Sequence, residues 1–280
     1  MRPNLAKVAN LAKVAKVAKV AKVAKNTSAG ATAKFGRTWQ GRRSNRSGCH
    51  SPFPRRPMTE TERIRRLYDD RAATYDRSLG IVERIMLGRF RQAYGALLRG
   101  ETIEVGVGSG LNIPFYSPDV TRLVGVDLSE EMLRHAHERA ENLGIPFTLV
   151  QANAEALPFP DATFDTVAIS LALCTIPDPA KALLELGRVC RPGGRIVMLE
   201  HVRSTARPLA ALQRVLSPFN ERAVGCHLDR DTFGLARSLG FSIDETQSRL
   251  FDSVQLVVAR PPAGAMLPSP DPIDAGGVKK

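Results

Sequence analysis

The residues with the clearest chemical potential form a glycine-rich segment, Glu104–Gly110, at the end of a short apolar run. Glycines let backbone amides approach a ligand closely and allow positive φ angles. They stand here as Gly106, Gly108 and Gly110, and Leu111 occupies the position where a dinucleotide fingerprint needs another small residue. The segment is therefore interpreted as a ligand-binding turn, and its spacing disfavours an NAD-dependent oxidoreductase.

Two further polar segments follow the next two predicted strands. Asp127 stands 21 residues beyond Gly106, where a carboxylate can accept both hydroxyls of a ribose. Capping of the next helix is the alternative role, but Ser129 already serves that end. The turn Asn153–Glu155 precedes the apolar Leu157–Phe159, a combination that suits the edge and the faces of an adenine ring. Three such segments on consecutive strands predict a nucleoside ligand.

Five other side chains are candidates for contact with the reacting groups. His201, just past the fifth predicted strand, is the first candidate for a general base, and His227 is the second. Packing or helix capping is the alternative role of His201. Cys174, near the end of the fourth strand, lines a substrate pocket or only packs, as buried cysteines usually do. Tyr68 and Tyr75 share one helical face and form either a lid over the ligand or an anchor to the sheet.

The elements that must position these residues alternate between helices and strands. Two helices are expected first, over Glu60–Ser78 and Ile81–Leu98, and later helices begin at the N-caps Ser129 and Asp178. The strands are predicted at Thr102–Val105, Arg122–Val126, Phe147–Gln151, Thr166–Leu171 and Arg195–Leu199. This alternation predicts a single α/β domain with a Rossmann-like, doubly wound, mostly parallel sheet and helices on both faces. Such sheets bind ligands at the carboxyl ends of their strands.

The charge of the chain is unevenly distributed. The formal net charge is +12, yet residues 1–58 hold 14 Lys and Arg and no acid, which leaves 26 basic and 28 acidic residues. A nearly neutral remainder argues against an extended phosphate-binding face, so nucleic acid is not the expected partner. The four cysteines show no metal-ligand spacing, which predicts no metal site and reduced thiols in a cytoplasmic protein. No apolar run is long enough to span a membrane, and the oligomeric state stays open.

Three segments follow from composition: a low-complexity basic tail (1–57), the folded domain (58–262) and a flexible C-terminal tail (263–280). The basic tail contains a Lys-Val-Ala repeat whose period of three drifts around a helix and leaves no apolar stripe. Three interpretations of the basic tail stay open. It is a start assigned too early, because Met58 directly precedes the first patterned helix; an organelle-targeting presequence; or a basic arm that contacts anionic lipid or nucleic acid.

Taken together, these segments resemble the class I S-adenosylmethionine-dependent methyltransferases of the methyltransferase type 11 group. The group includes ubiquinone/menaquinone C-methyltransferases and bacterial phosphatidylethanolamine N-methyltransferases. The matching segments are Tyr68–Asp76, Glu104–Gly110, Val126–Ser129, Ala154–Phe159 and Arg191–Gly194. The resemblance implies S-adenosylmethionine as the cofactor, with its methionine part held by Glu104 and the glycine turn. It places ribose at Asp127 and Leu128, and adenine at Asn153, Ala154 and Glu155; many relatives carry Asp where Asn153 stands.

A narrower resemblance concerns the acceptor of the methyl group. Leu171–Pro177, Leu199–Arg203 and Gly225–Thr232 are similar to the membrane-associated alkyl-thiol methyltransferases of animals. The run Gly106–Pro114 is similar to the bacterial phospholipid N-methyltransferases. Both relatives act on amphiphilic molecules, so the resemblance implies a small-molecule acceptor (a lipid-like amine, a thiol or a quinone) and peripheral contact with a membrane.

Two other functions stay open as alternatives. An RNA-directed methyltransferase is disfavoured because the segment after the fourth strand, Leu173–Pro177, lacks the Asn/Asp-Pro-Pro-aromatic run of base N-methylation. The Pro-Cys nucleophile of C5-cytosine methylation is also missing. A non-catalytic nucleotide-binding module is the other alternative, because a chain that loses catalysis can keep its binding loops.

Overall fold

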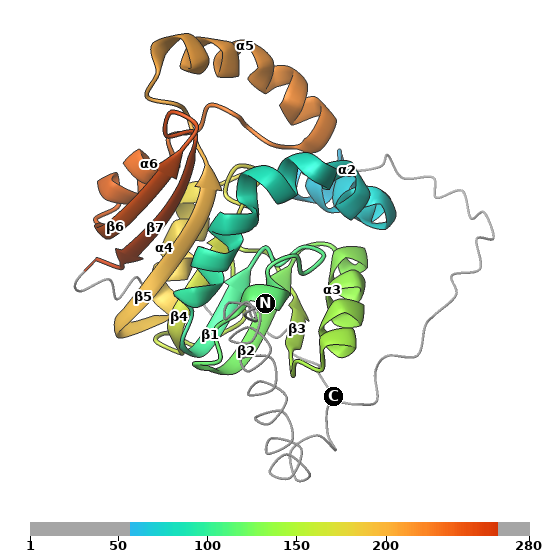
Figure 1. Cartoon of the computed structure of the whole chain (residues 1–280), viewed down its shortest axis with the longest axis vertical. Coiled ribbons are helices and arrows are strands. Elements are labelled where there is room, and N and C mark those ends of the chain that lie inside the picture. The colour runs from blue at the N-terminus through green and yellow to red at the C-terminus, as the bar shows by residue number, and fades with distance from the viewer. Residues whose placement is uncertain (1–56, 263–280) are drawn as a thin grey trace, which may run out of the picture.

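The computed structural model describes residues 57–262, and the side chains of 79–86 are excluded from that description. Residues 1–56, which make up nearly all of the predicted basic tail, and the predicted tail 263–280 lie outside the described residues. Within the described range, seven strands form one sheet in the order β3-β2-β1-β4-β5-β7-β6 (Figure 1). The predicted Rossmann-like α/β fold is thereby confirmed.

The first five strands run parallel. β7 lies antiparallel beside β5, and β6, which pairs antiparallel with β7, therefore has the direction of the first five strands. The strands are β1 Gly100–Val105, β2 Val120–Asp127, β3 Thr148–Gln151, β4 Phe164–Ser170, β5 Cys190–His201, β6 Ser242–Arg249 and β7 Val254–Arg260. All five predicted strands are present, with ends that differ by up to five residues. Because the strands are parallel, the segments that follow β1, β2, β3 and β4 all lie at the carboxyl ends of the strands.

The described helices are α2 Glu60–Ala96, η1 Ile113–Phe115, α3 Glu130–Leu143, α4 Pro179–Val189, α5 Arg207–Val224 and α6 Thr232–Ser238. Four of the described helices, α2, α3, α4 and α6, begin at a residue whose side chain caps them, whereas α5 and η1 have no side-chain cap. Ser129 accepts a hydrogen bond from the backbone N–H of Met132 at 3.1 Å, and Asp178 accepts one from Lys181 at 3.0 Å, which confirms both predicted N-caps. None of the described helices is long and apolar enough to cross a membrane.

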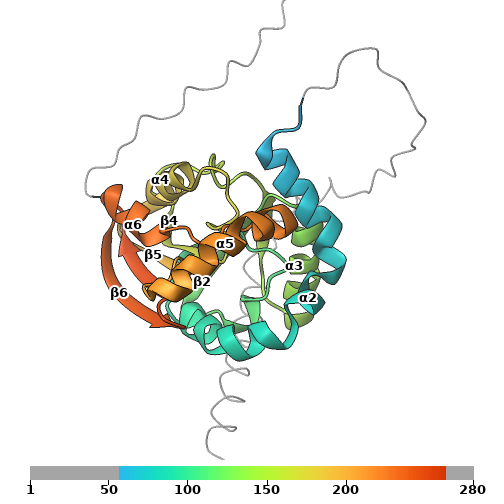
Figure 2. The same cartoon turned by 90° about the horizontal axis from the view of Figure 1, so that it is seen from above.

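The prediction of two separate helices before β1 was wrong, because α2 runs without a break from Glu60 to Ala96. A glycine inside a helix costs only about 1 kcal/mol relative to alanine, so Gly80 does not end it. The helix starts at a capping box, in which Thr59 and Glu62 bond each other's backbone N–H groups at 3.2 and 2.8 Å. It then curves over the sheet edge and along one face (Figure 2).

Alternate strand residues form two hydrophobic layers, because successive side chains of a strand point to opposite faces. On β5, Ile196 and Met198 pack with residues of α4 and α6, whereas Val197 and Leu199 pack with the second half of α2. Helix α3 covers the same face as α2, next to β2 and β3. Helix α5 contributes little to either layer and lies across the carboxyl-end edge of the sheet (Figures 1 and 2).

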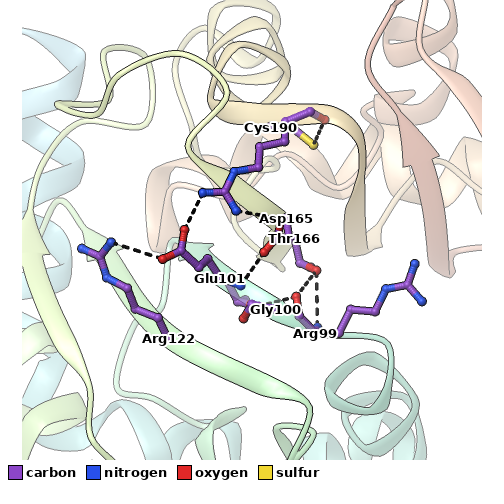
Figure 3. Close-up of polar contacts among 9 residues, drawn as sticks. Arg99, Gly100, Glu101, Arg122, Asp165, Thr166 and Cys190 are labelled. Atoms are coloured by element: carbon purple, nitrogen blue, oxygen red, sulfur yellow. Dashed lines mark hydrogen bonds and ion pairs between the residues drawn. The ribbon is translucent and has the colours of Figure 1, made fainter. Parts of the chain in front are cut away.

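Ion pairs join the strands at their amino ends, opposite the pocket end (Figure 3). Arg191 pairs with Glu101 at 2.5 Å and with Asp165 at 2.8 Å, and Arg122 lies 3.8 Å from Glu101. The carboxylate of Asp165 also accepts the backbone N–H of Glu101 at 2.8 Å. These contacts join the starts of β1, β4 and β5 and leave the carboxyl ends of the strands for ligand binding.

Candidate active site

A pocket opens at the carboxyl ends of the parallel strands, where the fold predicts a ligand site. Its walls come from the segments after β1, β2, β3 and β4, and from α2. The residues that line it include Tyr68, Tyr75, Arg91, Gly106, Gly108, Ser109, Asn112, Asp127, Leu128, Ser129, Asn153, Ala154, Ser170, Leu171, Ala172 and Thr175. The fold therefore brings most of the predicted cofactor residues into one cavity.

The glycine turn is fixed to the sheet on one side and open on the other. The backbone N–H groups of Gly106 and Val107 both donate to the carbonyl of Val126, at 2.8 and 3.0 Å. Gly106 has φ +70°, and a Cβ there would lie 2.5 Å from the Cβ of Ala172. Gly108 has φ +55°, and a Cβ there would meet nothing within 4 Å. The turn thus packs against the end of β4 through Gly106 and faces free space at Gly108.

Asp127 joins the glycine turn to helix α3. Its carboxylate accepts the backbone N–H of Gly108 at 2.8 Å and that of Ser129 at 2.9 Å. Burial raises the pKa of Asp127 above its usual value, against the opposing effect of these two hydrogen bonds. Each carboxylate oxygen has a second lone-pair direction, so the group can still accept hydrogen bonds from a ligand.

The turn after β3 is split between the pocket and the protein interior. Asn153 and Ala154 line the pocket, and the Asn153 side chain also accepts the backbone N–H of Glu155 at 3.0 Å. Glu155 is absent from the lining and instead accepts the backbone N–H of Asp178 at 3.0 Å. Leu157, expected in an apolar ligand wall, is buried in the hydrophobic core. A direct ligand contact of Glu155 stays a prediction that the geometry does not favour.

Glu104 lies behind the glycine turn and not in the pocket lining. It is fully buried and accepts hydrogen bonds from Asn112 at 2.5 Å, from Tyr94 at 3.0 Å and from the hydroxyl of Tyr116. Burial raises the pKa of Glu104 to about 7, although these donors act to lower it. Its nearest link to the pocket is Asn112, which does line it.

Helix α2 is anchored over the pocket by two aspartates that the sequence reasoning missed. Asp69 accepts the hydroxyl of Ser129 at 2.6 Å, and Asp76 accepts that of Ser109 at 2.5 Å. Tyr68 and Tyr75 line the pocket between these anchors, with ring centroids 6.0 Å apart. The helix therefore covers the pocket, and both tyrosines reach into it.

The end of β4 supplies two further features that no sequence pattern indicated. Within residues 57–262, the hydroxyl of Ser170 is buried without a hydrogen-bond partner, and Ser170 lines the pocket. Leu171 has φ +52°, a strained conformation for a residue with a branched side chain. Its backbone N–H donates to the carbonyl of Leu199 at 2.7 Å, which holds it there. Such strained residues cluster at functional sites.

Cys174 and His201 do not line this pocket but meet beside it, with Cys226. His201 Nε2 lies 2.7 Å from the sulfur of Cys226. The neighbouring Cys174 thiol and His201 lower the pKa of Cys226, against the effect of burial. The backbone N–H of His227 donates to the carbonyl of Cys174 at 3.0 Å, while its side chain lies 3.6 Å from Glu221. The role of His201 as a general base stays a prediction.

Comparison with known proteins identifies the family. A profile described as "Methyltransferase domain" matches residues 103–198. A phosphatidylethanolamine N-methyltransferase of Cereibacter sphaeroides is 39% identical over 172 residues, which cover 61% of this chain and 83% of that protein. The chain belongs to the S-adenosylmethionine-dependent methyltransferases. Its resemblance to that family is thus confirmed, and S-adenosylmethionine is its cofactor.

Two further comparisons agree with this assignment. The ubiquinone/menaquinone biosynthesis C-methyltransferase UbiE of Enterobacter sp. (strain 638) is 38% identical over 128 residues, 44% of this methyltransferase and 51% of that protein. A SAM-dependent methyltransferase of Thermotoga maritima superposes with a TM-score of 0.55 at 21% identity, covering 70% of this methyltransferase and 99% of that chain. The methyltransferase spans about half the length of UbiE, and the structural likeness concerns the fold alone.

The pocket of the methyltransferase fits this cofactor. The open space at Gly108 admits a ligand close to the backbone. The buried hydroxyl of Ser170 has no hydrogen-bond partner within residues 57–262, so it is available to bond a ligand. Asp127 stands within the same pocket as Asn153, as binding of a ribose and its adenine requires. The individual contacts of these residues with the cofactor remain predictions.

Proposed function

We propose that this enzyme methylates an amphiphilic small molecule, with a lipid-like amine as the first candidate and a thiol or a quinone as alternatives. The observation that carries the proposal is an exposed apolar stripe on α5. Leu212, Val215, Leu216 and Phe219 follow the i, i+3, i+4, i+7 pattern of one helix face, and all are exposed, Phe219 to 66%. An apolar stripe on an exposed helix face is suited to contact with lipid.

The C-terminal end of the helix that carries the stripe contacts the wall of the pocket. The hydroxyl of Tyr68, a lining residue, donates to the carbonyl of Val224 at the end of α5 at 3.3 Å. Arg71 of α2 donates to the carbonyl of Ala223 at 2.5 Å. An acceptor with its apolar part on α5 would therefore have a short path to the cofactor. The phosphatidylethanolamine N-methyltransferase named above, 83% of which this chain covers, supports an amine as the first candidate.

When bound, S-adenosylmethionine supplies an electrophilic methyl group on a sulfonium centre. The chain must then hold donor and acceptor in line and keep water out. Asp127, Asn153 and the glycine turn would fix the nucleoside and methionine parts, while α2, held by Asp69 and Asp76, would close the pocket.

The two tyrosines suit the positive charge of this reaction. Aromatic faces attract cations, and Tyr68 and Tyr75 present two rings to the pocket at a centroid separation of 6.0 Å. An amine acceptor must lose a proton for each methyl group that it receives, because only the neutral nitrogen is a nucleophile.

The test uses the purified full chain with methyl-labelled S-adenosylmethionine. The acceptors are vesicles that contain phosphatidylethanolamine, a long-chain thiol, a quinone precursor and total RNA, each offered separately. We expect label in the lipid arm. Label in the thiol or quinone arm would change the acceptor atom but keep the amphiphilic class, whereas label in RNA alone would overturn the proposal.

A matched pair of variants tests the role of α5. Val215→Asp with Phe219→Asp should lower vesicle binding and turnover on vesicle-borne acceptor by about tenfold, with S-adenosylmethionine affinity unchanged. Leu143→Asp changes an exposed apolar residue of α3 and should affect neither property. Equal losses in both proteins, or none in either, would remove α5 from the proposal.

A further inference from the structure

Three side chains that metals favour meet beside the pocket, although they are far apart in the sequence. Cys174 follows β4, His201 is the last residue of β5, and Cys226 follows α5. Their sulfur and nitrogen atoms all lie within 4.8 Å of one another. Both cysteines are buried and His201 is partly buried. Sequence spacing predicted no metal site, because a site assembled from three separate elements leaves no local pattern.

The chemistry of these groups selects the metal. Two thiolates and an imidazole form a soft ligand set that suits zinc. We propose that Cys174, His201 and Cys226 bind a zinc ion and leave its fourth coordination position open. Zinc sites with three protein ligands and an exchangeable fourth position are a recognised class, and Cys2His is one of their ligand sets.

The distances fit with a small adjustment. Zinc bonds of about 2.3 Å to sulfur and about 2.0 Å to nitrogen place tetrahedral ligand atoms roughly 3.5–3.8 Å apart. This separation lies within the 4.8 Å that contains all three atoms. The 2.7 Å contact of His201 with Cys226 must widen. It opens by about 0.8 Å on metal binding, a change that side-chain rotation supplies.

The backbone around the ligands is fixed by protein groups, so the site is organised in advance. Asn220 donates to the carbonyl of Cys226 at 2.6 Å, and the N–H of His227 donates to the carbonyl of Cys174 at 3.0 Å. Arg230 donates to the carbonyls on either side of Cys174, those of Leu173 and Ile176, at 2.6 Å each. Preorganisation of this kind is what a precise metal site needs.

A buried carboxylate stands next to His201 in the sequence. Among the residues that the structure describes, Glu200 Oε2 is a buried oxygen without a hydrogen-bond partner. Glu200 precedes His201 and interacts electrostatically with both His201 and Cys226.

The metal would tie the segment after α5 to the ends of β4 and β5. The same region touches the pocket, because Val224 accepts the hydroxyl of Tyr68 and Thr175 is a lining residue. Loss of the metal is therefore expected to loosen the wall between α2 and α5. The proposal does not depend on the identity of the methyl acceptor.

Metal content tests the proposal directly. The full chain is purified under reducing conditions without chelators, and bound zinc is measured by mass spectrometry. We expect one zinc per chain, and reconstitution with Co²⁺ should give the intense absorption of cobalt–thiolate bonds. Cys226→Ser and His201→Gln should each lower bound zinc at least tenfold. Cys190→Ser, which changes a buried cysteine outside the cluster, should keep one equivalent.

Each contrary outcome is decisive. Reduced wild-type chain that takes up neither zinc nor cobalt overturns the site, and so does a His201→Gln variant that keeps full metal content. His201→Gln retains both thiols, so it decides the matter even when the cysteine variants fail to fold. Because zinc is measured without S-adenosylmethionine or acceptor, a negative result leaves the proposed methyl transfer untouched.

Discussion

Replacement of Gly106 by alanine should destabilise the enzyme much more than replacement of Gly108. Both residues have positive φ, so each alanine would bear a left-handed conformation that costs about 1–2 kcal/mol. Only at position 106 would the new methyl group also overlap Ala172, at 2.5 Å. Overpacking of this kind costs about 1–3 kcal/mol. The expected losses of unfolding free energy are therefore about 2–5 kcal/mol for Gly106→Ala and about 1–2 kcal/mol for Gly108→Ala.

Urea denaturation of the full chain measures both losses. The midpoint should fall for Gly106→Ala while the denaturant slope stays unchanged, because the unfolded surface is the same. In thermal unfolding the corresponding decrease is about 2–4 °C for each kcal/mol in a domain of this size. Equal stability of the two variants, or a Gly106→Ala protein as stable as wild type, would refute the close packing of the glycine turn on β4.

Two further predictions concern buried charges. Glu104 has its pKa raised to about 7 in the folded enzyme, so the wild type loses stability as pH rises from about 4.5 to 7, by roughly 3 kcal/mol. Glu104→Gln should remove this share of the loss, while Glu200, whose pKa burial also raises to about 7, keeps its own share over the same pH range. An unchanged slope would contradict the burial of an acid at position 104. Arg188 pairs with Glu185 at 2.6 Å and donates to the carbonyls of Leu157 and Phe159 at 2.9 and 2.8 Å. Arg188→Met should lower the free energy of unfolding, measured by urea denaturation, by about 3 kcal/mol, because the mostly buried carboxylate of Glu185 loses its partner. A loss below about 1 kcal/mol would contradict the importance of this ion pair.

Local patterns predicted the parts of the fold that depend on neighbouring residues. The glycine turn, the caps Ser129 and Asp178 and the five parallel strands follow from conformational preferences and apolar runs, and the structure has them all. The antiparallel edge was not predicted. Strand β6 is polar and almost wholly exposed, so it carries no apolar alternation, and its place depends on pairing with β7.

The residues of the site also fall into those that local patterns predict and those that depend on tertiary packing. Asp127 and Asn153 follow predicted strands, and the parallel sheet brings them into one pocket. Glu104 lies within β1 and Glu155 follows β3, but their side chains turn toward protein donors, which depends on partners outside the local pattern such as Tyr94 and Asp178. The group of Cys174, His201 and Cys226 could not be predicted at all, because only the packing of the segment after α5 brings it together.

Calorimetry with S-adenosylmethionine tests the central claim most directly. The full chain should bind one equivalent, and Asp127→Ala should weaken binding about 100-fold, because two hydrogen bonds to a carboxylate are lost at about 1.5 kcal/mol each. Asp119→Ala, which removes an exposed acid from the loop before β2, should leave affinity unchanged. Failure of the wild-type chain to bind, or full affinity in Asp127→Ala, would contradict the assignment of this pocket to the cofactor.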